Sequence, residues 1–178
     1  SQGHEPYPTR AEQSHTSKQA IRLFEAAEAA AEALPQPVKV TLAGRLRAIR
    51  PMGKIIFAHI EDVDGRIQLF LRANDVGQEA LDLFNREFDL GDFVQANGEM
   101  FRTRTGEATL RVQSFRMLAK AVTPLPAAKD ELVDGQVVRH ATLADPEMRY
   151  RQRYADLAVN PEVREIFRLR AAITRALR

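Results

Sequence analysis

The sequence predicts a mainly β protein built on one five-stranded barrel. One helix is expected before the barrel, one between its third and fourth strands, and one after it, beyond a linker. Short runs of alternating apolar and polar residues, separated by Gly and Asp, fill residues 38–118. An alanine-rich run precedes them and ends at prolines. With 178 residues and 44% apolar content, the chain is long enough and apolar enough to bury one core.

Residues 1–37 divide into an extended arm and one helix. Prolines punctuate residues 4–10, which predicts an extended polar arm. Thr16 and Gln19 have the spacing of a capping box, and the alanine-rich run 20–34 follows them. We therefore expect one helix before the barrel.

The first three predicted strands alternate apolar and polar positions. Gly44 lies inside the first strand and indicates a bulge or a sharp bend. In residues 54–60 and 66–71 one face of each strand is apolar, and Asp-Gly between the two runs is typical of a hairpin. The opposite face carries Phe57 in one strand and Gln68 in the other. We expect these two side chains to share one outward face.

The remaining elements complete the barrel. Residues 75–88 have apolar side chains at intervals of four, which predicts an amphipathic helix that ends near Gly91. The fourth strand is expected at 93–96 and the fifth at 108–113, with a turn at 102–107 between them. Three strands, a helix and two strands is the order of an OB-fold, whose second and third strands and adjoining loops bind oligonucleotides.

The outward face of this barrel is a candidate nucleic-acid interface. Phe57 supplies a ring for base stacking, and Gln68 supplies an amide for hydrogen bonding. Residues 45–54 contain four cations and no acid, so one side of the barrel should be positive although the net charge is only +2. The same cations would also suit an edge that prevents strand pairing. The candidate phosphate contacts are Arg45, Arg47, Lys54, Arg102 and Arg104.

The composition excludes several classes of protein. Cysteine is absent, so disulfides, thiolate nucleophiles and zinc ribbons are ruled out. The four histidines have no paired ligand spacing, and no nucleophile or acid is placed to partner His59 in catalysis. No apolar stretch is long enough to span a bilayer, and the N-terminus lacks the pattern of a signal peptide. We expect a cytoplasmic protein with no metal site, no cofactor and no catalytic residue in this sequence.

After residue 118 the composition changes. Residues 119–160 are predicted to be an interdomain linker, because they begin with prolines and continue with mixed charge and no clear period. Asn160 and Pro161 are typical of a helix start, and the helix they begin covers residues 161–178. Its apolar stripe has no partner in the sequence. We therefore expect the chain to be part of a longer protein.

Residues 149–157, RYRQRYADL, closely resemble the run that follows the anticodon-binding domain in bacterial class II lysyl-tRNA synthetases. The resemblance extends from about Tyr7 to Arg178. It departs from the family pattern at Ala155, where leucine is usual, and at 129–143, which is longer than the common linker. Other segments that agree with the lysyl branch are 40–45, 52–54, 64–69, 89–92, 105–107 and 123–126.

The resemblance implies a site and an activity. In the family, the positions of Phe57 and Gln68 hold the central anticodon base, Arg50 aligns with an arginine near it, and Glu107 aligns with a glutamate that helps to recognise a neighbouring base. The implied partner is tRNA-Lys, and the implied full-length enzyme is a homodimeric lysine–tRNA ligase that uses ATP and Mg²⁺. Residues 161–178 resemble the start of class II motif 1. The ATP and lysine motifs would follow residue 178, so this chain alone is not expected to be catalytic.

Alternatives remain open at this point. An aspartyl- or asparaginyl-type synthetase would differ in its anticodon choice, and a non-catalytic single-strand-binding OB module would show little anticodon preference. From the strand pattern alone, Phe57 fits a second core under the N-terminal helix as well as it fits a binding face. Arg149, Arg151 and Arg153 are equally compatible with tRNA contact and with ion pairs.

Overall fold

The structure is a computed structural model that describes residues 8–30, 37–123, 129–133, 136–140, 143 and 145–178. The chain divides into two compact units, Ser1–Val122 and Thr123–Arg178, and each is described by itself. The first part of the predicted arm, the end of the predicted first helix and the prolines after residue 123 lie outside the described residues.

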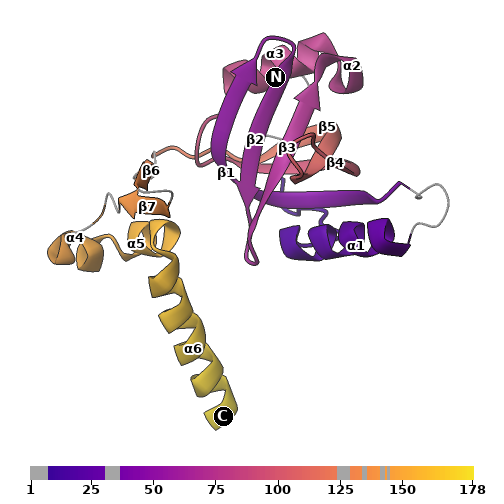
Figure 1. Ribbon diagram of the computed structural model, residues 1–178. Coiled ribbons are helices and arrows are strands. Elements are labelled where there is room, and N and C mark those ends of the chain that lie inside the picture. The colour runs from indigo at the N-terminus through magenta and orange to yellow at the C-terminus, as the bar shows by residue number, and fades with distance from the viewer. Residues whose placement is uncertain (1–7, 31–36, 124–128, 134–135, 141–142, 144) are drawn as a thin grey trace. The chain divides into compact units, whose positions relative to one another are not determined.

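Five strands of the first unit close into a barrel in the order β1-β2-β3-β5-β4 (Figure 1). Neighbouring strands are antiparallel except β3 and β5, which are parallel. The predicted barrel is therefore confirmed, with β4 and β5 longer than expected. The strands are β1 (Lys39–Met52), β2 (Ile55–Glu61), β3 (Arg66–Arg72), β4 (Phe93–Arg102) and β5 (Ala108–Ala119).

Strand β1 pairs with β4 through its first half and with β2 through its second half. Gly44 lies where these partners change, and a Cβ atom there would be 2.9 Å from the backbone oxygen of Glu61. The register irregularity itself falls between Leu46 and Ala48 rather than at Gly44. Glycine is needed at position 44 because two strands approach closely there, and not because the strand bulges at that residue.

The inward faces of the strands form one core. Its members in β2 and β3 are each at most 2% exposed, which confirms the predicted apolar faces. Burial of such side chains is the main source of folding free energy in a domain of this size. They are Ile56, Ala58, Ile60, Ile67, Leu69 and Leu71.

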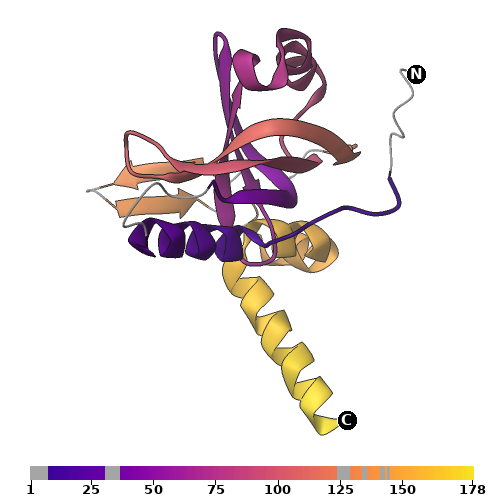
Figure 2. The same ribbon diagram turned by 90° about the vertical axis from the view of Figure 1, so that its right-hand side faces the viewer.

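Helix α1 (Ser17–Ala30) begins at the predicted capping box. The Thr16 N–H donates to Gln19 Oε1 over 3.0 Å, and the Gln19 N–H donates to Thr16 Oγ1 over 3.4 Å. The helix buries Ala20 and Phe24 in the barrel core. In both ribbon views α1 lies at one end of the barrel, while α2 and α3 lie at the other end (Figures 1 and 2).

Asp62, in the β2–β3 hairpin, also fixes the start of α1. Its Oδ1 accepts hydrogen bonds from the N–H groups of Asp64 and Gly65, which closes the turn of the predicted hairpin. Its Oδ2 accepts from the N–H and the hydroxyl of Ser17 over 2.6 and 2.8 Å. One carboxylate therefore joins the hairpin to the N-terminal helix.

The single helix predicted for residues 75–88 is wrong. The structure has two helices, α2 (Ala73–Val76) and α3 (Gln78–Glu87), separated by Gly77. Gly77 has a φ of 88°, a left-handed conformation that interrupts a right-handed helix. The apolar face of α3 buries Leu81 and Phe84 in the core, and of these two the spacing of four predicted Phe84 but not Leu81.

The second unit has more structure than a linker. Strands β6 (Lys129–Val133) and β7 (Gln136–His140) form a two-stranded antiparallel sheet inside the predicted linker, and helices α4 (Pro146–Arg151) and α5 (Arg153–Val159) follow. Helix α6 (Pro161–Leu177) begins at Pro161 as predicted. None of the helices in the described part of the chain is long and apolar enough to cross a membrane.

Candidate nucleic-acid interface

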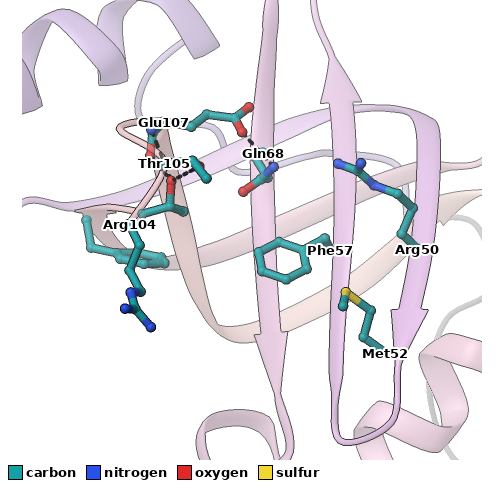
Figure 3. Close-up of a pocket in the computed structure, with 9 residues that line it drawn as sticks. Arg50, Met52, Phe57, Gln68, Arg104, Thr105 and Glu107 are labelled. Atoms are coloured by element: carbon teal, nitrogen blue, oxygen red, sulfur yellow. Dashed lines mark hydrogen bonds between the residues drawn. The ribbon is translucent and has the colours of Figure 1, made fainter.

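A cavity of about 550 Å³ lies on the outer face of the barrel, over β2, β3 and the β4–β5 loop. Its volume is in the usual range for a ligand site. Figure 3 shows Phe57 with Arg50 and Met52 on one side, the loop residues Arg104 and Thr105 on the other, and Gln68 beside it. The lining residues are Arg50, Met52, Phe57, Gln68, Phe101, Thr103, Arg104, Thr105 and Glu107.

The strand register explains why the ring of Phe57 faces this cavity. In the antiparallel pair of β2 and β3, Phe57 lies opposite Phe70, and His59 lies opposite Gln68. Directly opposed residues point to the same face of a sheet, and the alternate positions on both strands fill the core. Phe57 is partly exposed, so it is not sealed inside a second core. The shared outward face of Phe57 and Gln68 is present as the sequence predicted.

Phe57 belongs to a row of three rings that crosses the outer face. The ring centroids of Phe57 and Phe70 are 5.2 Å apart, and those of Phe70 and Phe101 are 5.5 Å apart. The Arg111 guanidinium lies 5.0 Å from the centroid of Phe101. Phe70 thus packs against both rings that line the cavity. Phe101 lies beyond residue 96, where the predicted fourth strand ended, so the sequence did not predict a role for it.

The β4–β5 loop has a fixed shape at the edge of the cavity. The N–H of Glu107 donates to Thr103 Oγ1 over 3.0 Å, and the N–H of Thr103 donates to the Glu107 carbonyl over 3.0 Å. Gly106, between them, has a φ of 88°, which favours glycine. These bonds place Glu107 beside β3, on the same side as Gln68 (Figure 3).

Gln68 is the buried polar group of the site, with 5% of its surface exposed. Its Nε2 donates to Glu107 Oε2 over 2.8 Å, and its Oε1 accepts from the Thr109 hydroxyl over 3.1 Å. His59 Nε2 lies 3.3 Å from Glu107 Oε1. Neither the Thr109 contact nor the His59 contact could be predicted, because each joins residues that are more than 40 positions apart in the sequence.

Comparison with known proteins supports the OB-fold assigned to the barrel. A family model described as an OB-fold nucleic acid binding domain, the tRNA anticodon-binding family, matches residues 40–118. The barrel within residues 40–118 is therefore similar to this family and has its OB-fold. Both pocket strands and the β4–β5 loop fall inside the matched segment. The sequence prediction of this fold is therefore confirmed.

Curated relatives are named lysine–tRNA ligase. The chain is 43% identical over 176 residues to the protein from Pelotomaculum thermopropionicum, covering 99% of the chain and 31% of the relative. It is 42% identical over 176 residues to that from Carboxydothermus hydrogenoformans, covering 99% and 32%. It is 45% identical over 139 residues to that from Aquifex aeolicus, covering 78% and 21%. The chain thus spans about a third of the length of the first two relatives.

The OB-fold domain has three exposed cations near the cavity. Arg50 lies directly opposite Phe57 in the β1–β2 register, Lys54 is in the turn between these strands, and Arg104 is in the β4–β5 loop. Within the described ranges no acidic side chain pairs with any of the three. They are therefore placed and available to contact an anionic ligand.

The other predicted phosphate contacts have partners within the OB-fold domain. Arg45 donates to the Gly91 carbonyl over 3.2 Å and stacks on Phe93, and Arg47 Nε donates to Glu61 Oε2 over 2.8 Å. Arg45 is opposite Glu61, which lies four residues along β2 from Phe57, or about 13 Å, and Arg47 lies at the register irregularity beside Ile60 and His59. Arg102 binds Glu28 and the Gly106 carbonyl. A phosphate would have to compete with these partners.

The arginines of the RYRQRY segment form ion pairs inside the second unit. Asp156 is fully buried and accepts from Arg149 Nε over 2.9 Å, from an Arg153 nitrogen over 2.6 Å and from Asn160 Nδ2 over 2.7 Å. Burial opposes its ionisation, but the bonds from Asn160 and Arg149 and the charges of Arg149 and Arg153 outweigh it and lower the pKa of Asp156. Arg151 pairs with Glu147 at the surface over 2.7 Å. Of the two roles left open for these arginines, the structure shows the ion pairs.

The described residues contain no group of three or more His, Asp or Glu side chains that could hold a metal ion. Glu107 is the one acidic residue among those that line the cavity, and it contacts Gln68 and His59. The arrangement offers a ring, a fixed amide and cations. These groups suit an unpaired nucleobase and its phosphates.

Proposed function

We propose that the OB-fold domain binds the anticodon loop of a lysine tRNA, as part of a lysine–tRNA ligase. The observation that supports it most is the partly exposed ring of Phe57 inside a cavity, next to the carboxamide of Gln68. The family match and the names of the relatives support the same proposal.

Recognition proceeds by unstacking the anticodon bases over β2 and β3. The central base stacks on Phe57, and such a contact is worth about 1–3 kcal/mol per base. Stacking accepts any base, so selectivity comes from hydrogen bonds between Gln68 and the edge of the base. Arg50, Lys54 and Arg104 contact the flanking phosphates and add affinity that depends on salt.

The activity of the whole protein is also a proposal. A lysine–tRNA ligase attaches lysine to tRNA in the cytoplasm with ATP and Mg²⁺, and by resemblance it works as a homodimer. The residues that the structure describes include no cluster able to hold a metal ion, so we assign none of them to ATP or Mg²⁺. We assign this chain the recognition of tRNA.

The test is a titration with anticodon stem–loop RNAs. Phe57→Ala should keep the fold and lower the affinity for the lysine anticodon at least about tenfold, because it removes a stacking contact. The matched control is Phe93→Ala, which removes a ring of the same barrel that is 37% exposed and outside the cavity. An unchanged titration for Phe57→Ala contradicts the site. Equal binding of every anticodon contradicts the function and favours a general single-strand-binding module.

A further inference from the structure

The NH₂ group and the oxygen of the Gln68 carboxamide are held by different residues. A carboxamide can turn by 180° about its last bond, which exchanges its oxygen and its NH₂ group. In the free OB-fold domain, NH₂ faces Glu107 and the oxygen faces Thr109.

Glu107 forbids the turned orientation. An ionised glutamate has acceptors only, so the group that faces Glu107 Oε2 must be a donor. In the turned orientation Gln68 Oε1 would face Glu107 Oε2 at 2.8 Å with no proton between them. The two oxygens would repel each other, and the NH₂ group of Gln68, which is 5% exposed, would lose its carboxylate acceptor, although the Glu107 side chain itself is 47% exposed.

Thr109 and His59 support the same orientation. Thr109 is fully buried and lies opposite Gln68 in the parallel β3–β5 register. Its hydroxyl is within donating distance of two acceptors, Gln68 Oε1 at 3.1 Å and the Glu107 carbonyl oxygen at 3.2 Å. His59 Nε2 lies 3.3 Å from Glu107 Oε1, the oxygen that Gln68 does not use. Glu107 is therefore held by side chains from two strands, which limits its freedom to turn toward a ligand.

We infer that Glu107 is a positioning residue that locks the Gln68 carboxamide, with Thr109, in the orientation that accepts uridine and rejects cytidine. This inference rests on the proposed function. It differs from the role that the family resemblance implies for Glu107, which is contact with a neighbouring anticodon base.

The chemistry of the two pyrimidines explains the selectivity. Uridine presents its O4 acceptor beside its N3–H donor, whereas cytidine presents its N4 amino donor beside its N3 acceptor, so the order is reversed. The locked Gln68 has one free N–H and one free oxygen lone pair for such an edge. If the base is held in one position on Phe57, a carboxamide fixed in one orientation can pair with uridine but not with cytidine. A carboxamide that turns freely could pair with either base.

The test compares RNAs with uridine or cytidine at the central anticodon position. Glu107→Gln keeps the size of the side chain but can donate as well as accept, so it releases the lock, and Thr109→Val removes the hydroxyl. Each should lower the preference for uridine about threefold to tenfold, the value of one hydrogen bond. Thr109→Ser keeps the hydroxyl and should retain the preference. In a Gln68→Ala background, Glu107→Gln should have no further effect on the ratio.

Two outcomes overturn the lock. One is an unchanged uridine preference in Glu107→Gln and Thr109→Val. The other is a Glu107→Gln protein whose loss falls on a neighbouring anticodon base, which would show direct contact by Glu107.

A second measurement does not depend on RNA. The side-chain NH₂ signals of Gln68 in the ¹⁵N NMR spectrum of the free protein should move on Glu107→Gln substitution and stay in place on Phe93→Ala substitution. Signals that do not move on Glu107→Gln overturn the lock even if RNA binds. If the signals move as expected but wild-type protein does not distinguish anticodons, the proposed function fails and the lock stands.

Discussion

The cavity on the OB-fold domain and the RYRQRY segment of the second unit both place arginines beside aromatic rings. At the cavity, Arg50 and Arg104 have no acidic partner among the described side chains. In the second unit, Arg149 and Arg153 both bind Asp156, which is fully buried. The difference shows that the position of the nearest acid, and not the density of charge in the sequence, decides whether an arginine of the described chain is held in an ion pair.

The largest effect should come from removing the acid in the second unit. Asp156→Ala leaves two arginines and Asn160 without their shared partner and should lower the stability of that unit by about 3 kcal/mol. Hydrogen exchange of the amides in 145–178 measures this loss. The affinity of the OB-fold domain for the lysine anticodon should stay within about twofold, a change of under 0.5 kcal/mol. A loss of affinity as large as that of Phe57→Ala would mean that the segment contacts RNA.

The same substitution should change the response of the second unit to acid. Because the pKa of Asp156 is lower in the folded protein than in the unfolded chain, its contribution is complete above the unfolded value of about 4 and is lost as pH falls through the folded pKa. The protection factors of the amides in 145–178, which are corrected for the pH dependence of intrinsic exchange, should therefore fall below about pH 4 in the wild-type protein. In Asp156→Ala that fall should be smaller. An equal fall in both proteins would assign the acid sensitivity to other carboxyl groups.

Much of the fold follows from local patterns in the sequence. Alternation in β2 and β3 is enough to place Phe57 and Gln68 on the outer face, and the spacing of Thr16 and Gln19 is enough to start α1. The helix break at Gly77 was missed because the apolar spacing of four continues across it. The β6–β7 hairpin was missed because its segment has no clear alternation.

The site could be predicted only in part, for a different reason. Phe57 and Gln68 lie on adjacent strands joined by a short turn, so their register follows from the sequence. Glu107 is brought to Gln68 by the β4–β5 loop, and Thr109 by a parallel strand pair that no local pattern indicates. Ion pairs such as Arg102 with Glu28 join residues far apart in the chain. Those contacts depend on how the barrel closes.

Arginine substitutions should have smaller effects and would sharpen the comparison. Arg50→Gln should weaken RNA binding about threefold to tenfold and reduce the slope of log affinity against log salt by about 0.7, the value for one phosphate of a single strand. Arg151→Gln is the matched control, because it removes an exposed cation that is already paired with Glu147. It should leave both quantities unchanged. Equal slopes for Arg50→Gln and wild type would remove Arg50 from the interface.

The most direct test of the central claim is a photochemical cross-link from the anticodon to the protein. An RNA stem–loop with 5-iodouridine at the central anticodon position keeps the hydrogen-bonding edge of uridine and cross-links to a ring stacked on it. After digestion with trypsin, the RNA should be attached to the peptide 55–66 that contains Phe57. Attachment to peptides that contain Tyr150 or Tyr154, with none in the barrel, would contradict the account.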